Sequence, residues 1–236
     1  MRSLLRSLLS PLLQWHARLV APRMVYGWRA ADRGWRAHTR VSTHTYIESP
    51  ELLAMGDHVF IGHHNFIDAS GGLTLGEGVQ ITNHCSVLTH SSHRALRLER
   101  QAYWGHPAPS GRERAPTSIG EWSFVGPHSV IAPGSRLGAG VLVKAYSFVR
   151  GEVPDFAVVE GRPARVVGDV RELDRAWIER EAPASFSGEQ REAYEAWVQR
   201  VERAERTSPR GGGVAGAAAG RDPADSTDPY NARWKP

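Results

Sequence analysis

The sequence contains only one cysteine, Cys85, in 236 residues. A single thiol excludes an internal disulfide framework and is compatible with a reducing cytoplasm. Cys85 lies four positions after Ile81, where the repeat described below places small inward side chains. We therefore interpret it as a buried structural thiol rather than a nucleophile.

A strong charge of one sign and long hydrophobic runs are also missing. The net charge is +4, and the arginines are spread along the chain, which argues against a dense nucleic-acid-binding run. No apolar run approaches the roughly 18 to 20 residues that cross a bilayer, and no clear signal-peptide cleavage site is present. We expect a soluble, cytoplasmic protein without a nucleic-acid partner.

What the chain does contain is a six-residue period. An aliphatic residue returns at every sixth position: Ile119, Val125, Ile131, Leu137, Val143 and Val149. Neither a helix nor an ordinary sheet repeats every six residues, so this is the hexapeptide repeat of a β-helix. Each hexapeptide makes one short strand and a corner, three make a triangular coil, and the aliphatic side chains are expected to stack inside the prism.

The same register continues upstream. It is found at Val41, Ile47, Met55, Ile61, Ile67, Leu75, Ile81 and Val87. The step from Ile67 to Leu75 is eight residues, and the surplus falls in residues 69–72, where a glycine pair turns the chain without steric cost. We predict an all-β solenoid over residues 41–168.

The segments outside the prism have other patterns. Residues 1–40 are predicted to be a helical segment, with leucines on one face that pack on the prism of the same or a neighbouring subunit. The alternative is weak contact of residues 1–25 with the inner membrane face. Residues 169–206 are predicted to be helical. Residues 207–236 lack the apolar content for a core and are expected to be disordered.

The repeat is interrupted between Val87 and Ile119. The interruption begins with Thr89, His90, Ser91, Ser92, His93 and Arg94, and we predict a protruding loop over residues 91–116. Because solenoids usually carry such insertions on their binding face, function is expected here.

The repeat array, a histidine just before a protruding loop, and the closing segment VPDFAVVEGRPAR over residues 153–165 together resemble the left-handed β-helix acyltransferases. The resemblance covers residues 41–168 and is to the maltose/galactoside and polysaccharide O-acetyltransferase branch in particular. It implies a left-handed parallel β-helix and a homotrimer that binds acetyl-CoA between adjacent prisms, without a metal. It also implies direct acyl transfer to a saccharide or other small hydroxyl acceptor, in which a histidine takes the hydroxyl proton.

Two histidines compete for the role of the base. The family's base usually lies five or six residues after the inward aliphatic residue, here Val87, which selects His93. His90 lies only three residues after Val87 and is expected to orient the base or contact the substrate. A neutral imidazole suits proton removal because its ordinary pKa lies near physiological pH.

The resemblance also implies binding residues. Asp68 matches the position of a polar acceptor-binding residue. Its carboxylate could accept hydrogen bonds from sugar hydroxyls or orient the base. The alternative is that it only caps the following turn. Asn83 is a second acceptor-binding candidate. The implied acetyl-CoA contacts are Gly126, Ala145, Arg150 and Arg165. The family usually has a Thr-Lys pair at the position of Arg150. Arg150 keeps a cation for a phosphate group, but the hydroxyl contact of the threonine is lost.

Two other functions fit a solenoid of this kind. γ-Class carbonic anhydrases share the prism and hold zinc with three histidines. His58 and His63 have the five-residue step of such a site, but a third ligand at the required spacing is missing. The other alternative is a non-enzymatic scaffold, which would assemble without binding CoA.

Overall fold

The computed structural model of the chain describes residues 2–183 and 185–207, with side chains from residue 9 onward. The chain divides into two units, Met1–Pro183 and Ala184–Pro236. The first unit holds the solenoid, and the second holds helix α4 (Gly188–Thr207). The prediction of a disordered tail over residues 207–236 falls, apart from Thr207, outside the described residues.

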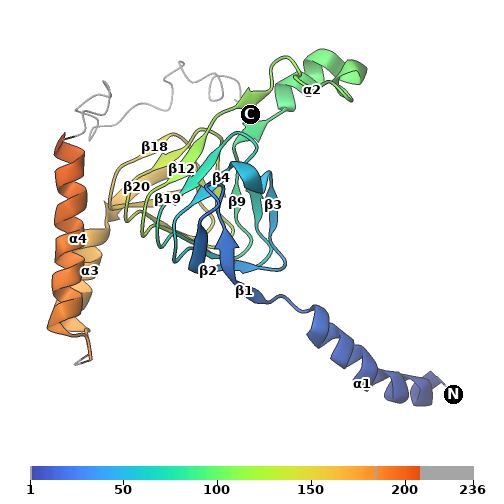
Figure 1. The fold of residues 1–236 in the computed structure, drawn as a ribbon, viewed down its shortest axis with the longest axis horizontal. Helices are drawn as coiled ribbons and strands as arrows, with labels where there is room; N and C mark the ends of the chain where they lie inside the picture. The colour runs from blue at the N-terminus through green and yellow to red at the C-terminus, as the bar shows by residue number, and fades with distance from the viewer. Residues whose placement is uncertain (1, 184, 208–236) are drawn as a thin grey trace. The chain divides into compact units, whose positions relative to one another are not determined.

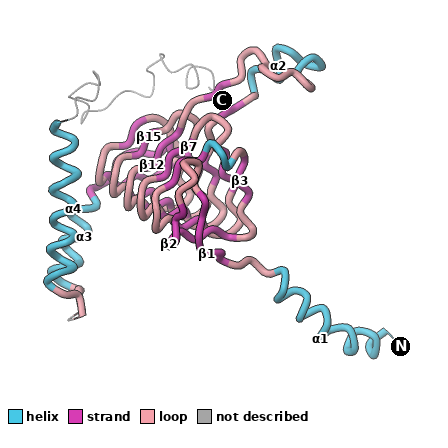
Figure 2. The backbone as a smooth tube through the Cα atoms, in the orientation of Figure 1, coloured by secondary structure: helices cyan, strands magenta, loops and turns pink. Residues whose placement is uncertain are grey.

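Three sheets form the walls of a triangular solenoid (Figure 1 and Figure 2). Sheet A has the order β1 (Met24–Arg29), β2 (Trp35–Ser42), β5 (Phe60–Ile61), β8 (Gln80–Ile81), β13 (Phe124–Val125), β16 (Leu142–Val143), β19 (Ala157–Gly161) and β20 (Ala164–Asp169). Sheet B has the order β17 (Phe148–Val149), β14 (Val130–Ile131), β9 (Ser86–Val87), β6 (Phe66–Asp68) and β3 (Tyr46–Glu48). Sheet C has the order β18 (Glu152–Val153), β15 (Arg136–Leu137), β12 (Thr117–Ile119), β7 (Leu73–Leu75) and β4 (Leu53–Met55).

Successive coils are in register at the aliphatic residues of the repeat. Strands β5 and β8 pair in parallel through Ile61 and Ile81, and β13 and β16 pair through Val125 and Val143. All four side chains are fully buried. Burying one such side chain contributes about 1.5–3 kcal/mol, and the stacked rows form a continuous core. The predicted left-handed parallel β-helix is confirmed.

Small inward residues close the corners, as the repeat predicted. Ser129 is buried, and its hydroxyl donates to the carbonyl of Lys144 in the next coil at 3.1 Å. Cys85 is also buried, and its Sγ lies 3.3 Å from the carbonyl oxygen of Gly126. Burial raises the pKa of this thiol, which agrees with a structural role.

Antiparallel strand pairs extend sheet A at both ends. Strand β1 pairs with β2, and β19 pairs with β20. Helix α1 (Arg2–Val20) ends well before residue 40. The predicted helical segment over residues 1–40 is thereby corrected: strands β1 and β2 follow the helix and pair at the edge of sheet A beside β5.

Short helices complete the described chain. Between β3 and β4 lies η1 (Pro50–Leu52). Helix α3 (Val170–Arg180) follows β20 and begins at the N-cap Asp169, whose carboxylate accepts the backbone N–H of Arg171 at 2.8 Å.

Within the described residues, no helix has the length and apolar character that a membrane span requires.

Candidate active site

The interrupted repeat forms a protruding loop with a closed neck. Strands β10 (His90–Ser91) and β11 (Glu113–Arg114) pair in antiparallel fashion and bring His90 opposite Arg114. The backbone N–H of Ala115 donates to the carbonyl of Thr89 at 2.9 Å. Between the two strands lie helices α2 (His93–Glu99) and η2 (Arg100–Tyr103) (Figure 1). This neck holds His90 at the wall of the prism.

Asp68 ends strand β6 and lies directly beneath this neck. Its side chain is fully buried. One carboxylate oxygen accepts the backbone N–H of Ser70 at 2.8 Å, and the other accepts the backbone N–H groups of Thr89 at 2.8 Å and His90 at 3.0 Å. These contacts fix the carboxylate in one orientation.

The hydrogen bonds also fix the charge of Asp68. Burial alone would raise the pKa of this carboxyl, but hydrogen bonds from Ser70 and Thr89 outweigh burial and hold the pKa below its ordinary value. Asp68 therefore carries a negative charge throughout the neutral pH range.

His90 points its Nδ1 at this buried charge. The distance from His90 Nδ1 to Asp68 Oδ2 is 2.8 Å, and the hydroxyl of Ser70 lies 2.9 Å from the same nitrogen. An ionised carboxylate only accepts hydrogen bonds, so the Nδ1–H donates to Asp68. The neutral ring then keeps a lone pair on Nε2, which is the form needed to accept a proton.

His93 lies at the start of helix α2 in a different environment. Its Nδ1 is 2.8 Å from the hydroxyl of Ser91, two residues earlier in the loop. The side chain is half-buried. Asp68 thus orients His90, and Ser91 contacts the ring of His93.

Three further residues near His90 did not stand out in the sequence. Glu48 pairs in register with Asp68 on the preceding coil, and one donor atom from each of Glu48, Asp68 and His90 lies within 4.8 Å of the others. Ser70 contacts His90 through its hydroxyl, and a guanidinium nitrogen of Arg114 donates to the carbonyl of Ser70. In the sequence, the twenty-residue spacing between Glu48 and Asp68 was the one feature that could have pointed to Glu48.

Glu48, Asp68 and His90 are also a possible donor set for a metal ion. Oδ2 of Asp68 already accepts the backbone N–H groups of Thr89 and His90 and faces His90 Nδ1. A cation at this oxygen would have to displace these hydrogen bonds. The arrangement therefore fits an acid–imidazole pair better than a metal site.

The other predicted binding residues lie elsewhere on the prism. Asn83 is exposed after strand β8 of sheet A, and its Oδ1 accepts the backbone N–H of His63 at 2.7 Å. Gly126 and Ala145 also follow strands of sheet A and are neighbours in successive coils. Asp68, by contrast, ends a strand of sheet B. Within one chain these residues occupy two different corners.

The two predicted arginines are likewise separated. Arg150 is exposed directly after strand β17 of sheet B. Arg165 is exposed on strand β20, and its guanidinium donates to the carbonyl of Ala164 at 3.1 Å. The structure therefore brings Asp68 and His90 together but distributes the predicted cofactor contacts over the solenoid.

The zinc alternative is not favoured by the positions of its histidines. His58 lies before strand β5, with its Nδ1 3.4 Å from Glu77 Oε1. His63 lies after β5, with its Nδ1 2.7 Å from the hydroxyl of Ser42. The strand between them places the two rings at opposite ends of one wall.

No family model matches the chain, but several known proteins are similar to it. Galactoside O-acetyltransferase of Escherichia coli K12 is 28% identical over 143 residues, which is 57% of this chain and 66% of that enzyme. Serine acetyltransferase 4 of Arabidopsis thaliana is 29% identical over 127 residues, 53% of this chain and 32% of that enzyme.

The chain is similar to the hexapeptide-repeat acetyltransferases. The resemblance predicted from the repeat and the closing segment is thus confirmed. The matched region spans just under two thirds of the galactoside enzyme and about a third of the serine enzyme. Among solved structures, a maltose O-acetyltransferase from Clostridium difficile 630 is 18% identical, with a TM-score of 0.43 over 54% of this chain and 64% of that one.

Proposed function

We propose that the protein is an acyl-CoA-dependent O-acyltransferase that transfers acetyl from acetyl-CoA to a saccharide hydroxyl. The observation that carries this proposal is the contact of 2.8 Å between the buried carboxylate of Asp68 and His90 Nδ1. It supplies an oriented neutral imidazole at an interrupted coil, in a chain similar to acetyltransferases. The saccharide acceptor is proposed because one of these relatives is a galactoside O-acetyltransferase.

The proposed reaction is direct transfer. Nε2 of His90 takes the proton of the acceptor hydroxyl while the hydroxyl oxygen attacks the thioester carbonyl carbon. When the tetrahedral intermediate collapses, the carbon–sulfur bond breaks and the proton returns from the imidazolium to the departing thiolate. Asp68 positions the ring and stabilises its charged form. No bond between the protein and the acyl group is needed.

Of the two histidines predicted from the sequence, we propose His90 as the base. The buried carboxylate of Asp68 lies 2.8 Å from its Nδ1 and orients the ring. His93, half-buried at the start of the loop helix, is proposed to contact the acceptor. The carboxylate of Glu48, with an oxygen within 4.8 Å of His90 and Asp68, is proposed to accept a hydrogen bond from a second hydroxyl of the sugar. Asn83 lies at another corner of the prism and is proposed to reach an acceptor only from a neighbouring subunit.

We further propose a homotrimer in which acetyl-CoA lies between two prisms. Gly126 and Ala145 follow strands of one sheet and Arg150 follows a strand of another, so one prism alone does not gather these proposed cofactor contacts. A second copy would supply the missing wall. Light scattering is expected to give three times the chain mass of 26.0 kDa. A fully active monomer would contradict the proposal.

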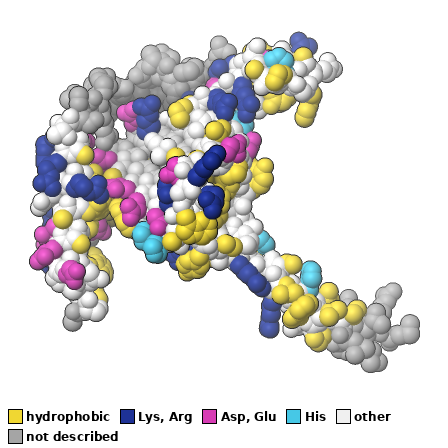
Figure 3. Space-filling model, viewed as in Figure 1, with side chains coloured by type: hydrophobic (Ala, Val, Ile, Leu, Met, Phe, Trp, Pro, Cys, Tyr) yellow, Lys and Arg dark blue, Asp and Glu magenta, His cyan; other side chains and the backbone are white. Residues whose placement is uncertain are grey.

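Helix α1 supports a weak peripheral contact with an anionic membrane surface. Its Leu12, Leu13 and Trp15 are each more than 60% exposed, and hydrophobic side chains are visible along this helix in Figure 3. The first acidic residue of the chain is Asp32, whereas arginine occurs five times before it. Exposed apolar residues together with unbalanced positive charge favour the interface of anionic lipids.

Changing Leu12 and Leu13 to serine is expected to reduce cosedimentation with vesicles containing phosphatidylserine, because the apolar contact is removed. The matched control is Val166→Ser, an exposed residue of strand β20, which should sediment like the unchanged protein. If the leucine variant keeps its vesicle binding and instead melts at a lower temperature, α1 packs on a neighbouring subunit.

A further inference from the structure

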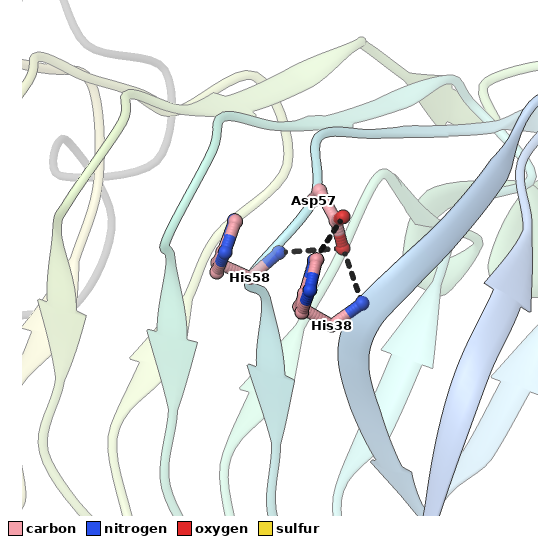
Figure 4. Close-up of side chains that lie close together, drawn as sticks. All are labelled: His38, Asp57 and His58. Atoms are coloured by element: carbon pink, nitrogen blue, oxygen red, sulfur yellow. Dashed lines mark hydrogen bonds and ion pairs between the residues drawn. The ribbon is translucent and has the colours of Figure 1, made fainter.

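Two histidines stack at a corner between sheets C and A, on the opposite side of sheet C from the corner that carries His90 (Figure 4). His38 lies on strand β2, and His58 lies two residues before the start of strand β5. Because β2 and β5 pair in parallel, the two histidines occupy equivalent positions in successive coils. Their ring centroids are 4.5 Å apart and the ring planes differ by 5°.

Each of these histidines faces a carboxylate. His38 Nδ1 lies 2.9 Å from Asp57 Oδ2, and His58 Nδ1 lies 3.4 Å from Glu77 Oε1. Tetrahedral zinc holds nitrogen and oxygen ligands at about 2.0–2.2 Å, which places neighbouring ligand atoms about 3.3–3.6 Å apart. The His58–Glu77 pair has the spacing of two ligands on one ion, and the His38–Asp57 pair needs to open by about 0.5 Å to reach it.

Asp57 is held in place by the corner itself. Its Oδ1 accepts the backbone N–H groups of His38 at 2.9 Å and His58 at 2.8 Å, together with the hydroxyl of Thr39 at 3.2 Å. These contacts hold the carboxylate in one orientation, with Oδ2 as a ligand atom beside the two imidazoles.

We propose that His38, Asp57 and His58 bind a divalent transition-metal ion of the zinc class. One donor atom from each residue lies within 4.8 Å of the others, and two imidazoles with a carboxylate are a donor set that zinc prefers. Glu77 or water completes the coordination.

The site closes by small movements of exposed side chains. Parallel stacked rings do not aim their lone pairs at one point, so the rings must rotate out of the stack. The side chains of His38 and His58 are 66% and 47% exposed, and the outer torsion of histidine is broad. The proton on His38 Nδ1 moves to Nε2, which frees Nδ1 for the metal without changing the charge of the ring.

The test is isothermal titration of zinc chloride into untagged, EDTA-treated protein. We expect one zinc ion per chain, and we expect the double variant His38→Asn, His58→Asn to weaken binding by at least about tenfold. His58 has a backbone φ of 60°, a conformation that asparagine tolerates, so this variant should fold. Asp57→Asn keeps the carbonyl oxygen that caps the backbone and should weaken binding by about 10–100-fold through loss of the carboxylate.

A second group of histidines provides the control. The rings of His64, His84 and His128 stack along the corner between sheets A and B. His84→Asn, with the same change of side chain, should leave the zinc affinity unchanged. Equal affinity in the double variant and the unchanged protein, or a loss of binding in His84→Asn alone, would overturn the proposal. Neither result depends on acyl transfer, because no residue of the proposed metal site belongs to the Asp68–His90 pair.

Discussion

His90→Ala is expected to lower the turnover number by about 10²–10⁴, because the variant lacks the imidazole that takes the hydroxyl proton. The Michaelis constant for acetyl-CoA should change little, since the imidazole acts in the transition state rather than in holding the cofactor. Steady-state kinetics in which acetyl-CoA is varied at a saturating concentration of a saccharide acceptor give both quantities. Asp68→Asn should also lower turnover, because its amide no longer stabilises the charged ring and its NH2 group would face a backbone N–H that the carboxylate accepts.

His93→Ala is the matched control for this prediction. Both histidines lie in the same interrupted coil and neither belongs to the aliphatic stack, so neither change should unfold the protein. His93→Ala is expected to raise the Michaelis constant for the acceptor with a smaller effect on turnover. A severe loss of turnover in His93→Ala together with near-normal activity in His90→Ala would reverse the assignment. Near-normal activity in both variants would rule out a histidine base.

Ile67→Ala is expected to lower the free energy of unfolding by about 2–5 kcal/mol. Ile67 is fully buried and pairs in register with Ile47 on one side and Val87 on the other. Truncation leaves a cavity between three successive coils, and the short strands on either side have little freedom to collapse into it. Urea denaturation followed by circular dichroism measures the change.

Val166→Ala provides the comparison, since Val166 is 58% exposed on strand β20. Its effect should stay within about 0.5 kcal/mol. If Ile67→Ala were as mild as Val166→Ala, the aliphatic row would not be the source of the stability of the solenoid.

The solenoid was predictable from sequence because its period is strict. Six-residue steps from Ile119 to Val149 correspond to one strand per step, and the structure pairs these residues in register. The eight-residue step after Ile67 also falls at a corner, ahead of strand β7. Regular steric repetition of this kind leaves few alternative folds for the core.

The contact between Asp68 and His90 was predictable only in part. The sequence offered Asp68 as a residue that could orient the base, but counting from Val87 selected His93 as that base, and the position of each imidazole depends on how the loop leaves the prism. The neck between β10 and β11 holds His90 against Asp68, and this pairing joins residues 22 positions apart. The sequence predicted a helical segment up to residue 40, but helix α1 ends at Val20. Strands β1 and β2 gain their stability by pairing at the edge of sheet A, and the local sequence pattern does not reveal that edge.

The most direct test of the account is thiol release from acetyl-CoA by the purified protein, measured against free sugars, nucleotide sugars and glycans, with mass spectrometry of the product. The account predicts CoA release that depends on a saccharide acceptor, a product heavier by one acetyl group on oxygen, and loss of both signals in His90→Ala. Absence of acceptor-dependent CoA release across the panel, from protein that is folded and assembled, would contradict it.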